Sequence, residues 1–135
     1  MKRRFGRETW SLGIADGWHG RHDPDCATIV AVPEVGALQI SAFFNDSAVT
    51  DADLREFAAE HLEAGAISRK VTLGDFVGFT IAFGTKDEFW REWYLRNGGQ
   101  MLFVTYNCDA DQRGIEDEAV DEMLATLSAQ GEHVA

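Results

Sequence analysis

The chain has 135 residues, of which 45% are hydrophobic and 11% aromatic; these values fit one folded domain of residues 1–135 and exclude a disordered chain. No apolar run approaches the roughly 20 residues of a membrane-spanning helix, so we expect no membrane partner. The formal net charge is −11, which repels phosphate backbones and disfavours nucleic-acid binding, whereas a basic protein partner is electrostatically favoured.

Residues 1–7 are predicted to form a basic N-terminal segment outside the first strand. This start has the charge of a signal peptide, but Glu8 and alternating polar residues follow it in place of an apolar core of about 7–15 residues. Cys26 and Cys108 provide neither a disulfide framework nor the spacing of a zinc site. We therefore expect a cytoplasmic protein with reduced thiols.

Alternating apolar residues predict the first strand, in which Trp10, Leu12 and Ile14 share one face before a turn at Asp16-Gly17. From Trp18 onward, the sequence is predicted to be a polar loop. Residues 28–32 and 37–44 are the next two predicted strands, and the turn at Pro33 makes them a hairpin.

Thr50 is predicted to begin a helix, because Thr50 and Asp53 form a capping box that satisfies free helical N–H groups. Gly65 is predicted to end it. The buried stripe, at offsets of three and four residues, comprises Leu54, Phe57, Ala58, His61 and Leu62. A strand pair over residues 68–73 and 76–83 follows, joined at Gly74-Asp75.

Residues 89–108 contain two aromatic runs around a Gly-Gly turn and predict a second hairpin. With Gly98-Gly99 as the loop, the cross-strand pairs are Leu95 with Leu102, Trp93 with Val104, Arg91 with Tyr106 and Phe89 with Cys108, which form a nearly continuous apolar face. An alternative loop at Asn97-Gly98 places Leu95 opposite Gln100. We prefer the first register.

Residues 115–127 predict a second helix, which faces the core through Val120, Met123, Leu124 and Leu127. Glu116 lies with Asp117 and Glu118 in its first turn, where carboxylates complement the helix dipole, and residues 129–135 form a C-terminal tail. The element order and short connections indicate an α+β fold with an antiparallel sheet of about six to seven strands. Because several strands are apolar on both faces, we expect the two helices to flank the sheet on both sides, as an α/β/α sandwich.

The densest group of potential metal ligands contains His19, His22, Asp23, Asp25 and Cys26. It matches no helical zinc motif, no EF-hand loop and no paired-cysteine motif, so we expect a solvated loop, no metal and no cofactor. No catalytic residue is predicted either, because the chain has no nucleophile elbow or family cysteine motif. His61 is interpreted as a partly buried histidine with its hydrogen bonds satisfied, and His133 as part of a fraying tail.

The second face of the 89–108 hairpin is the leading candidate for a partner-binding surface. It carries Trp90, Glu92, Tyr94, Arg96 and Phe103, which are residue types enriched at interaction hot spots. Coverage of this face by a helix is the alternative. A second candidate is a ligand site in the loop region of Trp18, His19 and His22.

Five short segments carry a family resemblance: Asp16-Gly17-Trp18, the strand at residues 36–41, the Val49-Thr50 helix start, the corner at residues 74–78, and Thr105-Tyr106. With them, residues 8–128 resemble the PsbP-like superfamily, which includes the photosystem subunit PsbP and the Ran-binding factor Mog, and especially its small bacterial members. The resemblance implies an α/β/α fold and a non-catalytic binding role, such as an assembly factor, adaptor or chaperone. It assigns no functional residue.

Two functional hypotheses follow. The first is a non-catalytic protein-binding module of a bacterial cytosol, such as an adaptor, a chaperone or an acidic immunity-type protein that neutralises a basic toxin. The second is a small-molecule-binding protein or enzyme that uses the cleft beside Trp18, His19 and His22. The sequence leaves the oligomeric state and the identity of the partner open.

Overall fold

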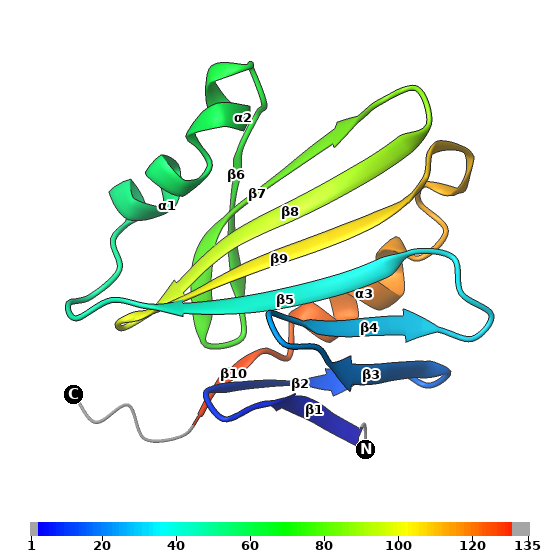
Figure 1. Ribbon diagram of the computed structural model, residues 1–135, viewed down its shortest axis with the longest axis horizontal. Helices are drawn as coiled ribbons and strands as arrows, with labels where there is room; N and C mark the ends of the chain where they lie inside the picture. The colour runs from blue at the N-terminus through cyan, green and yellow to red at the C-terminus, as the bar shows by residue number, and fades with distance from the viewer. Residues whose placement is uncertain (1–2, 131–135) are drawn as a thin grey trace.

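The computed structural model describes residues 3–130, which form a seven-stranded sheet, a three-stranded sheet and three α-helices (Figure 1). Figure 1 shows α1 and α2 on one side of the large sheet and the small sheet on the other. The α+β class and an antiparallel sheet of seven strands are as expected from the sequence, but the predicted strand at residues 10–14 lies in the small sheet and residues 18–22 take its place in the large one. Within the described residues, no helix is both long and apolar enough to cross a membrane.

Neighbouring strands of the large sheet are all antiparallel, in the order β3-β4-β5-β9-β8-β7-β6. The strands, in chain order, are β3 (Trp18–His22), β4 (Ala27–Ala31), β5 (Ala37–Phe44), β6 (Arg69–Leu73), β7 (Phe76–Gly84), β8 (Glu88–Asn97) and β9 (Gln100–Asp109).

The preferred register of the β8–β9 hairpin is confirmed. Leu95 lies opposite Leu102 and Trp93 opposite Val104, with Gly98 and Gly99 between the strands. Gly98 has a positive φ of 57°, a conformation that glycine adopts without the steric cost that other residues meet.

One face of the large sheet packs on α3 (Asp117–Leu124) and on the small sheet, whose strands are β1 (Arg3–Arg7), β2 (Trp10–Ile14) and β10 (Ser128–Ala129). We call this side the core face. Its buried cluster joins Leu38, Ile40, Trp93, Leu102 and Val104 of the sheet to side chains of β2 and α3. This cluster is the main hydrophobic core.

The opposite face packs partly on α1 (Asp51–Phe57) and α2 (Ala59–Glu63). The predicted capping box at the start of α1 is present, since Asp53 N donates to Thr50 Oγ1 at 3.1 Å and Thr50 N donates to Asp53 Oδ2 at 2.9 Å. The predicted single helix is wrong, because the chain breaks at Ala58 into two short helices. Of the predicted stripe, Leu54 and Ala58 are buried and His61 and Leu62 half-buried, whereas Phe57 is 47% exposed.

The polar loop predicted from Trp18 onward is also wrong, because residues 18–22 form the edge strand β3. Only Trp18 of this strand is buried, so the strand lacks the alternation from which it could have been predicted. A turn in which Asp23 N donates to Cys26 O at 2.8 Å brings β3 back against β4.

Both predicted terminal segments contribute strands. Residues 3–7 form β1, where Arg3 donates to Trp18 O at 2.9 Å and Arg4 donates to Ser11 Oγ at 2.7 Å. Ser128 and Ala129 form β10, which pairs with β2. His133 and the rest of residues 131–135 lie outside the described part of the chain.

The second helix is shorter than predicted, and Glu116 does not serve as a solvated first-turn carboxylate. Its side chain is buried, and Oε1 accepts hydrogen bonds from Gly36 N at 3.0 Å and from Tyr106 OH at 2.7 Å. Glu116 therefore ties the start of α3 to β9 and to the loop before β5.

Candidate functional site

The face of the large sheet opposite α3 is only partly covered, and we call it the open face. The buried cluster beneath α1 and α2 takes its sheet residues from β7, β8 and β9, and none from β3, β4 or β5. Half-buried side chains of the uncovered strands include Val30, Gln39 and Ser41. A broad strip of this face is therefore accessible.

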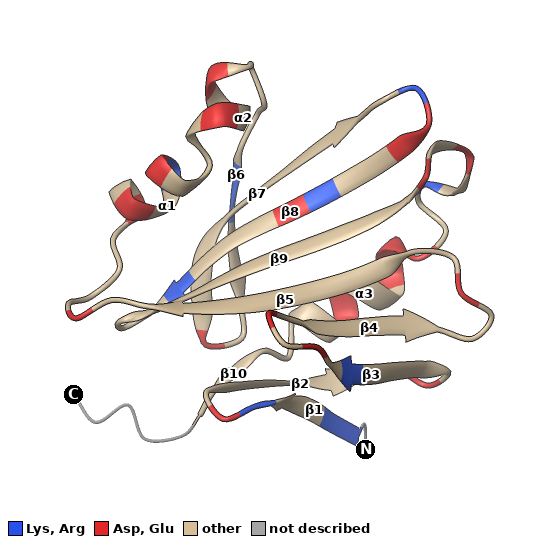
Figure 2. Cartoon of the chain, viewed as in Figure 1, with Lys and Arg blue, Asp and Glu red and all other residues tan. Residues whose placement is uncertain are grey.

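Within the uncovered strip, charged side chains are confined to the edge strand β3, whose Arg21 is exposed and, by alternation with the buried Trp18, lies on this face. The strands β4 and β5 contain no Lys, Arg, Asp or Glu, and β9 contains only Asp109 at its end (Figure 2). In a chain with a net charge of −11, such a strip is unusual. Depletion of charge is a feature of the central part of protein–protein interfaces.

Aromatic rings line the border between the covered and uncovered parts of the open face. Phe57 of α1 contacts Phe43 of β5 at 5.6 Å and Phe103 of β9 at 5.4 Å, measured between ring centroids. Phe43 is 45% exposed and Phe57 47% exposed, while Phe103 is half-buried. These three rings form what we call the aromatic border.

The structure divides the predicted partner-binding residues into two groups. Trp90 and Phe103 are half-buried and border the open face, and Trp90 Nε1 donates to Glu88 Oε1 at 3.3 Å. Tyr94 and Glu92 are buried, at 2% and 6% exposure. Arg96 is bound to Asp51 of α1, with 2.8 Å between Nε and Oδ1. Three of the five predicted residues are therefore buried beneath the helices or bound to them, and two border the open face.

Beneath α2, a buried carboxylate connects the helix to the sheet. Glu92 Oε1 accepts a hydrogen bond from Tyr94 OH at 2.5 Å and lies 3.5 Å from His61 Nε2. Burial and the hydrogen bond to Glu92 raise the pKa of Tyr94 well above its ordinary value, so its hydroxyl stays protonated and continues to donate. His61 also stacks on Phe83 at 4.6 Å, which matches its interpretation as a partly buried histidine with a partner.

The second predicted site is not brought together. Trp18 belongs to the hydrophobic core at 5% exposure. His22 is on the same face of the sheet, where it stacks on Phe5 at 4.9 Å and its Nε2 lies 2.6 Å from Gly6 O. His19 is exposed and, because side chains alternate along a strand, projects from the other face. Among residues 3–130, no group of three or more His, Cys, Asp or Glu side chains could hold a metal ion.

Sequence reasoning missed two members of the aromatic border. For Phe57, the helical periodicity predicts a place in the buried stripe of a continuous helix. Phe43 could have been found, because the alternation that puts Phe44 on the core face puts Phe43 on the opposite face.

Neither a family model nor a curated protein sequence matches this chain. Solved structures do. A protein of Bacteroides thetaiotaomicron VPI-5482 matches with a TM-score of 0.67 and 17% identity over 91% of this chain, which spans only 46% of that longer protein.

Two further structures match over nearly their whole lengths. LpqN, described as involved in cell envelope biogenesis of Mycobacterium tuberculosis, matches with a TM-score of 0.64 at 14% identity. The match covers 90% of this chain and 83% of LpqN. The cyanobacterial PsbP of Synechocystis sp. PCC 6803 matches with a TM-score of 0.60 at 12% identity, and the match covers 94% of this chain and 91% of that protein. The chain has a PsbP-like fold.

Proposed function

We propose that the protein is a non-catalytic protein-binding module that engages its partner through the open face. The observation that carries this proposal is the aromatic border beside β4 and β5, two uncovered strands without charged residues. Contiguous exposed apolar surface of this kind marks interaction sites, and aromatic anchors supply much of the binding energy at protein interfaces.

The charges around the open face favour a basic partner. The exposed carboxylates of Glu56 and Glu60 lie on the helices, and those of Glu88 and Asp109 lie at the ends of β8 and β9 (Figure 2). An uncharged centre with an acidic rim steers a basic surface into place and excludes an acidic one. An adaptor, a chaperone or an immunity-type protein that neutralises a basic toxin would each use such a surface.

The non-catalytic part of the proposal rests on how the polar groups near this face are used. Glu92 is engaged by Tyr94 and His61, and Arg96 by Asp51. These contacts hold the helices on the sheet. The small-molecule alternative has less support, since Trp18 is buried in the hydrophobic core and His19 and His22 lie on opposite faces of the sheet.

The cytosol is the compartment that we propose, because Cys26 and Cys108 are both free thiols, as is usual in reducing compartments. The envelope role given for the structurally similar LpqN makes the bacterial envelope the alternative. Cell fractionation with an antibody against the native protein distinguishes the two.

The test first captures a partner protein that binds the open face and purifies that partner. The partner's affinity is compared for the wild-type chain, for the double variant Phe43→Ser/Phe57→Ser and for Ile115→Ser. Ile115 is a matched control, because it is 65% exposed and precedes α3 on the other side of the molecule.

We expect the double variant to weaken binding by at least about 30-fold, the effect of removing two aromatic contacts of about 1 kcal/mol each or more, and Ile115→Ser to leave it unchanged. Equal affinity for all three proteins would overturn the proposal. Loss of binding on Ile115→Ser alone would place the interface elsewhere.

A further inference from the structure

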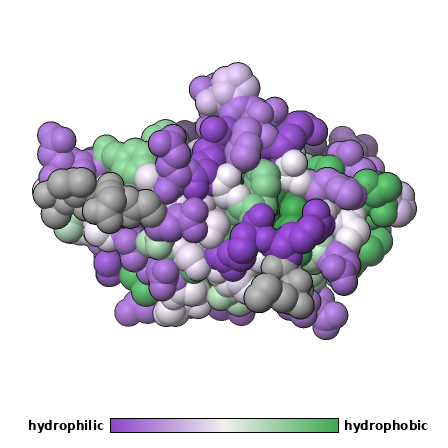
Figure 3. Space-filling model, turned by 90° about the horizontal axis from the view of Figure 1, so that it is seen from below, coloured by the Kyte–Doolittle hydropathy of each residue, from purple (hydrophilic) through white to green (hydrophobic). Residues whose placement is uncertain are grey.

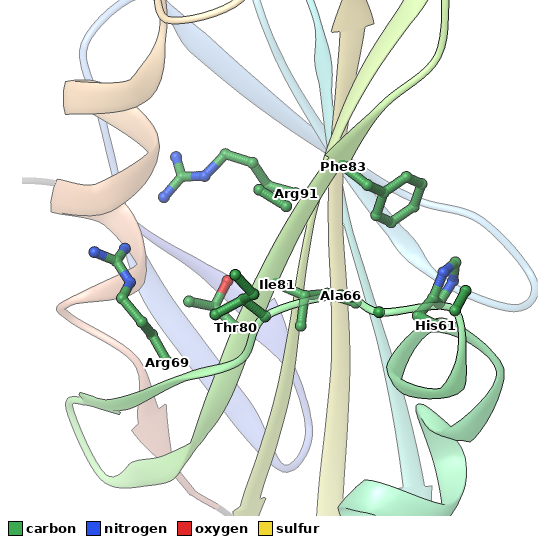
Figure 4. A pocket seen from close by; sticks show the side chains of 11 residues that line it. His61, Ala66, Arg69, Thr80, Ile81, Phe83 and Arg91 are labelled. Atoms are coloured by element: carbon green, nitrogen blue, oxygen red, sulfur yellow. The ribbon is translucent and has the colours of Figure 1, made fainter.

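A groove of about 710 Å³ runs along the outer edge of β7, beyond Thr80, where β7 no longer pairs with β6. Its walls include His61, Ile67, Arg69, Ala82, Phe83 and Arg91. Figure 4 shows that the side chains of these walls lie on both sides of the strand, with Phe83 and His61 on one side and Arg69 and Arg91 on the other. The groove therefore follows a strand edge, and does not lie on one face of the sheet.

The pairing of the strands shows which backbone groups line the groove. β7 extends to Gly84, but its last partner on β6 is Arg69, opposite Thr80. Thr85 N donates to Glu88 O at 2.8 Å, so odd-numbered residues of β7 direct their N–H and C=O groups toward β8. By alternation, Ala82 and Gly84 direct theirs toward the groove.

These edge groups are unpaired in the part of the chain that the structure describes. Residues 66–68 precede β6 but make no backbone hydrogen bond to Ala82 or Gly84. Exposed strand edges are normally guarded by charged side chains or proline. β6 follows this rule with Arg69 and Lys70, whereas residues 82–84 of β7 are Ala, Phe and Gly.

The two walls of the groove differ in chemistry. Phe83 and the strongly exposed Ile67, at 84%, provide apolar surface. On the side toward α3, Arg91 is bound to Asp117 and Asp121, but Arg69 makes no ion pair or side-chain hydrogen bond with a described residue. No carboxylate lines the groove.

We propose that the free edge of β7 binds an extended acidic segment of a partner protein by strand addition. A strand antiparallel to β7 would place the residues that pair with Ala82 and Gly84 on the side of Arg69, where carboxylates are favoured. The residues between them would face Phe83, where apolar side chains are favoured. This site is separate from the aromatic border, so either proposal can fail without the other.

The probe is the peptide acetyl-Thr-Val-Glu-Val-Glu-Thr-amide, titrated into the isotope-labelled full chain and followed by NMR and amide hydrogen exchange. In the free protein, the amides of Ala82 and Gly84 should exchange faster than those of Ile81 and Phe83, which are bonded to β8. The peptide should slow exchange at Ala82 and Gly84 and shift the signals of Ile67 and Arg69.

The matched control peptide carries N-methyl groups on both glutamates, the residues whose N–H groups would pair with β7. It should bind at least about tenfold more weakly than the unmodified peptide. The protein variant Ala82→Pro should weaken binding to the same extent, because proline removes the edge N–H of residue 82 and leaves the hydrogen bonds between β7 and β8 intact. Ala82→Ser keeps that N–H and should bind normally. Arg69→Gln should also weaken binding.

Three results would overturn the proposal. One is equal affinity for the N-methylated peptide. Another is a set of peptide-induced shifts confined to Phe43, Phe57 and Phe103. The third is protection of Ala82 and Gly84 without peptide, rising with protein concentration, which would show that a second copy of the chain occupies the edge.

Discussion

The two faces of the large sheet are built from the same strands but differ in how far their side chains are buried. In β5, Leu38 and Ile40 are buried on the core face at 0% and 1% exposure, whereas Gln39 and Ser41, on the open face, are half-buried. Because side chains alternate along a strand, one run of residues supplies both a packed core and an accessible strip. Stability should therefore depend on one face and partner binding on the other.

A third side of the molecule lacks the features of the open face. Figure 3 shows the side on which β1 and β2 lie, where hydrophilic residues dominate and hydrophobic patches are small. Arg3, Arg4 and Arg7 of β1 are exposed there. This side therefore differs from the open face, where uncharged strands lie beside the aromatic border.

Truncation in the core face should produce the largest effect on stability. Trp93 is 2% exposed and packs beneath the guanidinium of Arg91, 4.6 Å from its ring. Trp93→Ala should lower the free energy of unfolding by about 4 kcal/mol, through lost burial and the cavity that remains, as measured by urea denaturation. A loss below about 1 kcal/mol would show that the core face does not determine stability.

Glu116→Ala should have the next largest effect, because it leaves two donors, Gly36 N and Tyr106 OH, buried without an acceptor. We expect a loss of about 3 kcal/mol in the free energy of unfolding. Glu118→Ala is the matched control, since Glu118 is an exposed carboxylate of the same helix, and its effect should stay within about 0.5 kcal/mol. Equal effects of the two variants would contradict the role of Glu116.

High pH should destabilise both sides of the sheet together. The chain has two tyrosines, Tyr106 on the core face and Tyr94 beneath α1 and α2. In the folded state the pKa of each tyrosine is raised, mainly by burial and to a smaller extent by a hydrogen bond to a carboxylate. The carboxylate is that of Glu116 for Tyr106 and that of Glu92 for Tyr94. Their contribution to stability is complete below the unfolded pKa near 10 and is lost as the pH rises above it.

The free energy of unfolding should therefore fall by about 1.4 kcal/mol per pH unit for each tyrosine above pH 10. In a titration followed by tyrosinate absorbance, ionisation should coincide with loss of secondary structure in circular dichroism. Ionisation of one tyrosine near pH 10 in the folded protein would show that its hydroxyl is open to solvent.

The smallest effect on stability should come from the open face. Phe43→Ser removes a ring that is already 45% exposed, so it should change the free energy of unfolding by less than about 1 kcal/mol. A loss above about 2 kcal/mol in urea denaturation would assign the aromatic border to the core, and would remove the contrast between the two faces.

The extent to which the sequence predicts this structure differs between elements. The β8–β9 register follows from sequence because its cross-strand apolar pairs and Gly-Gly turn agree. The strands β1 and β3 could not be predicted from sequence, because edge strands with mostly exposed residues carry no alternating pattern. They are held by hydrogen-bond partners that are distant in sequence. Arg3, for example, donates to Trp18 O, 15 positions away.

The candidate site shows the same limit. The sequence places Trp90, Tyr94 and Phe103 on one face but cannot say which of them a helix covers. That depends on the break at Ala58 and on where α2 lies, which Glu92 and His61 help to determine through a contact between segments 31 residues apart. Long-range packing therefore divides a surface that local pattern treats as one.

The most direct test of the open face as the interface is site-specific photo-crosslinking in the native host. Benzoylphenylalanine replaces Phe43 in one strain and Ile115 in another, and adducts are identified by mass spectrometry after irradiation. The account predicts a defined protein adduct from position 43 and none from position 115. Adducts from position 115 alone, or none from position 43 in cells that express the folded protein, would contradict it.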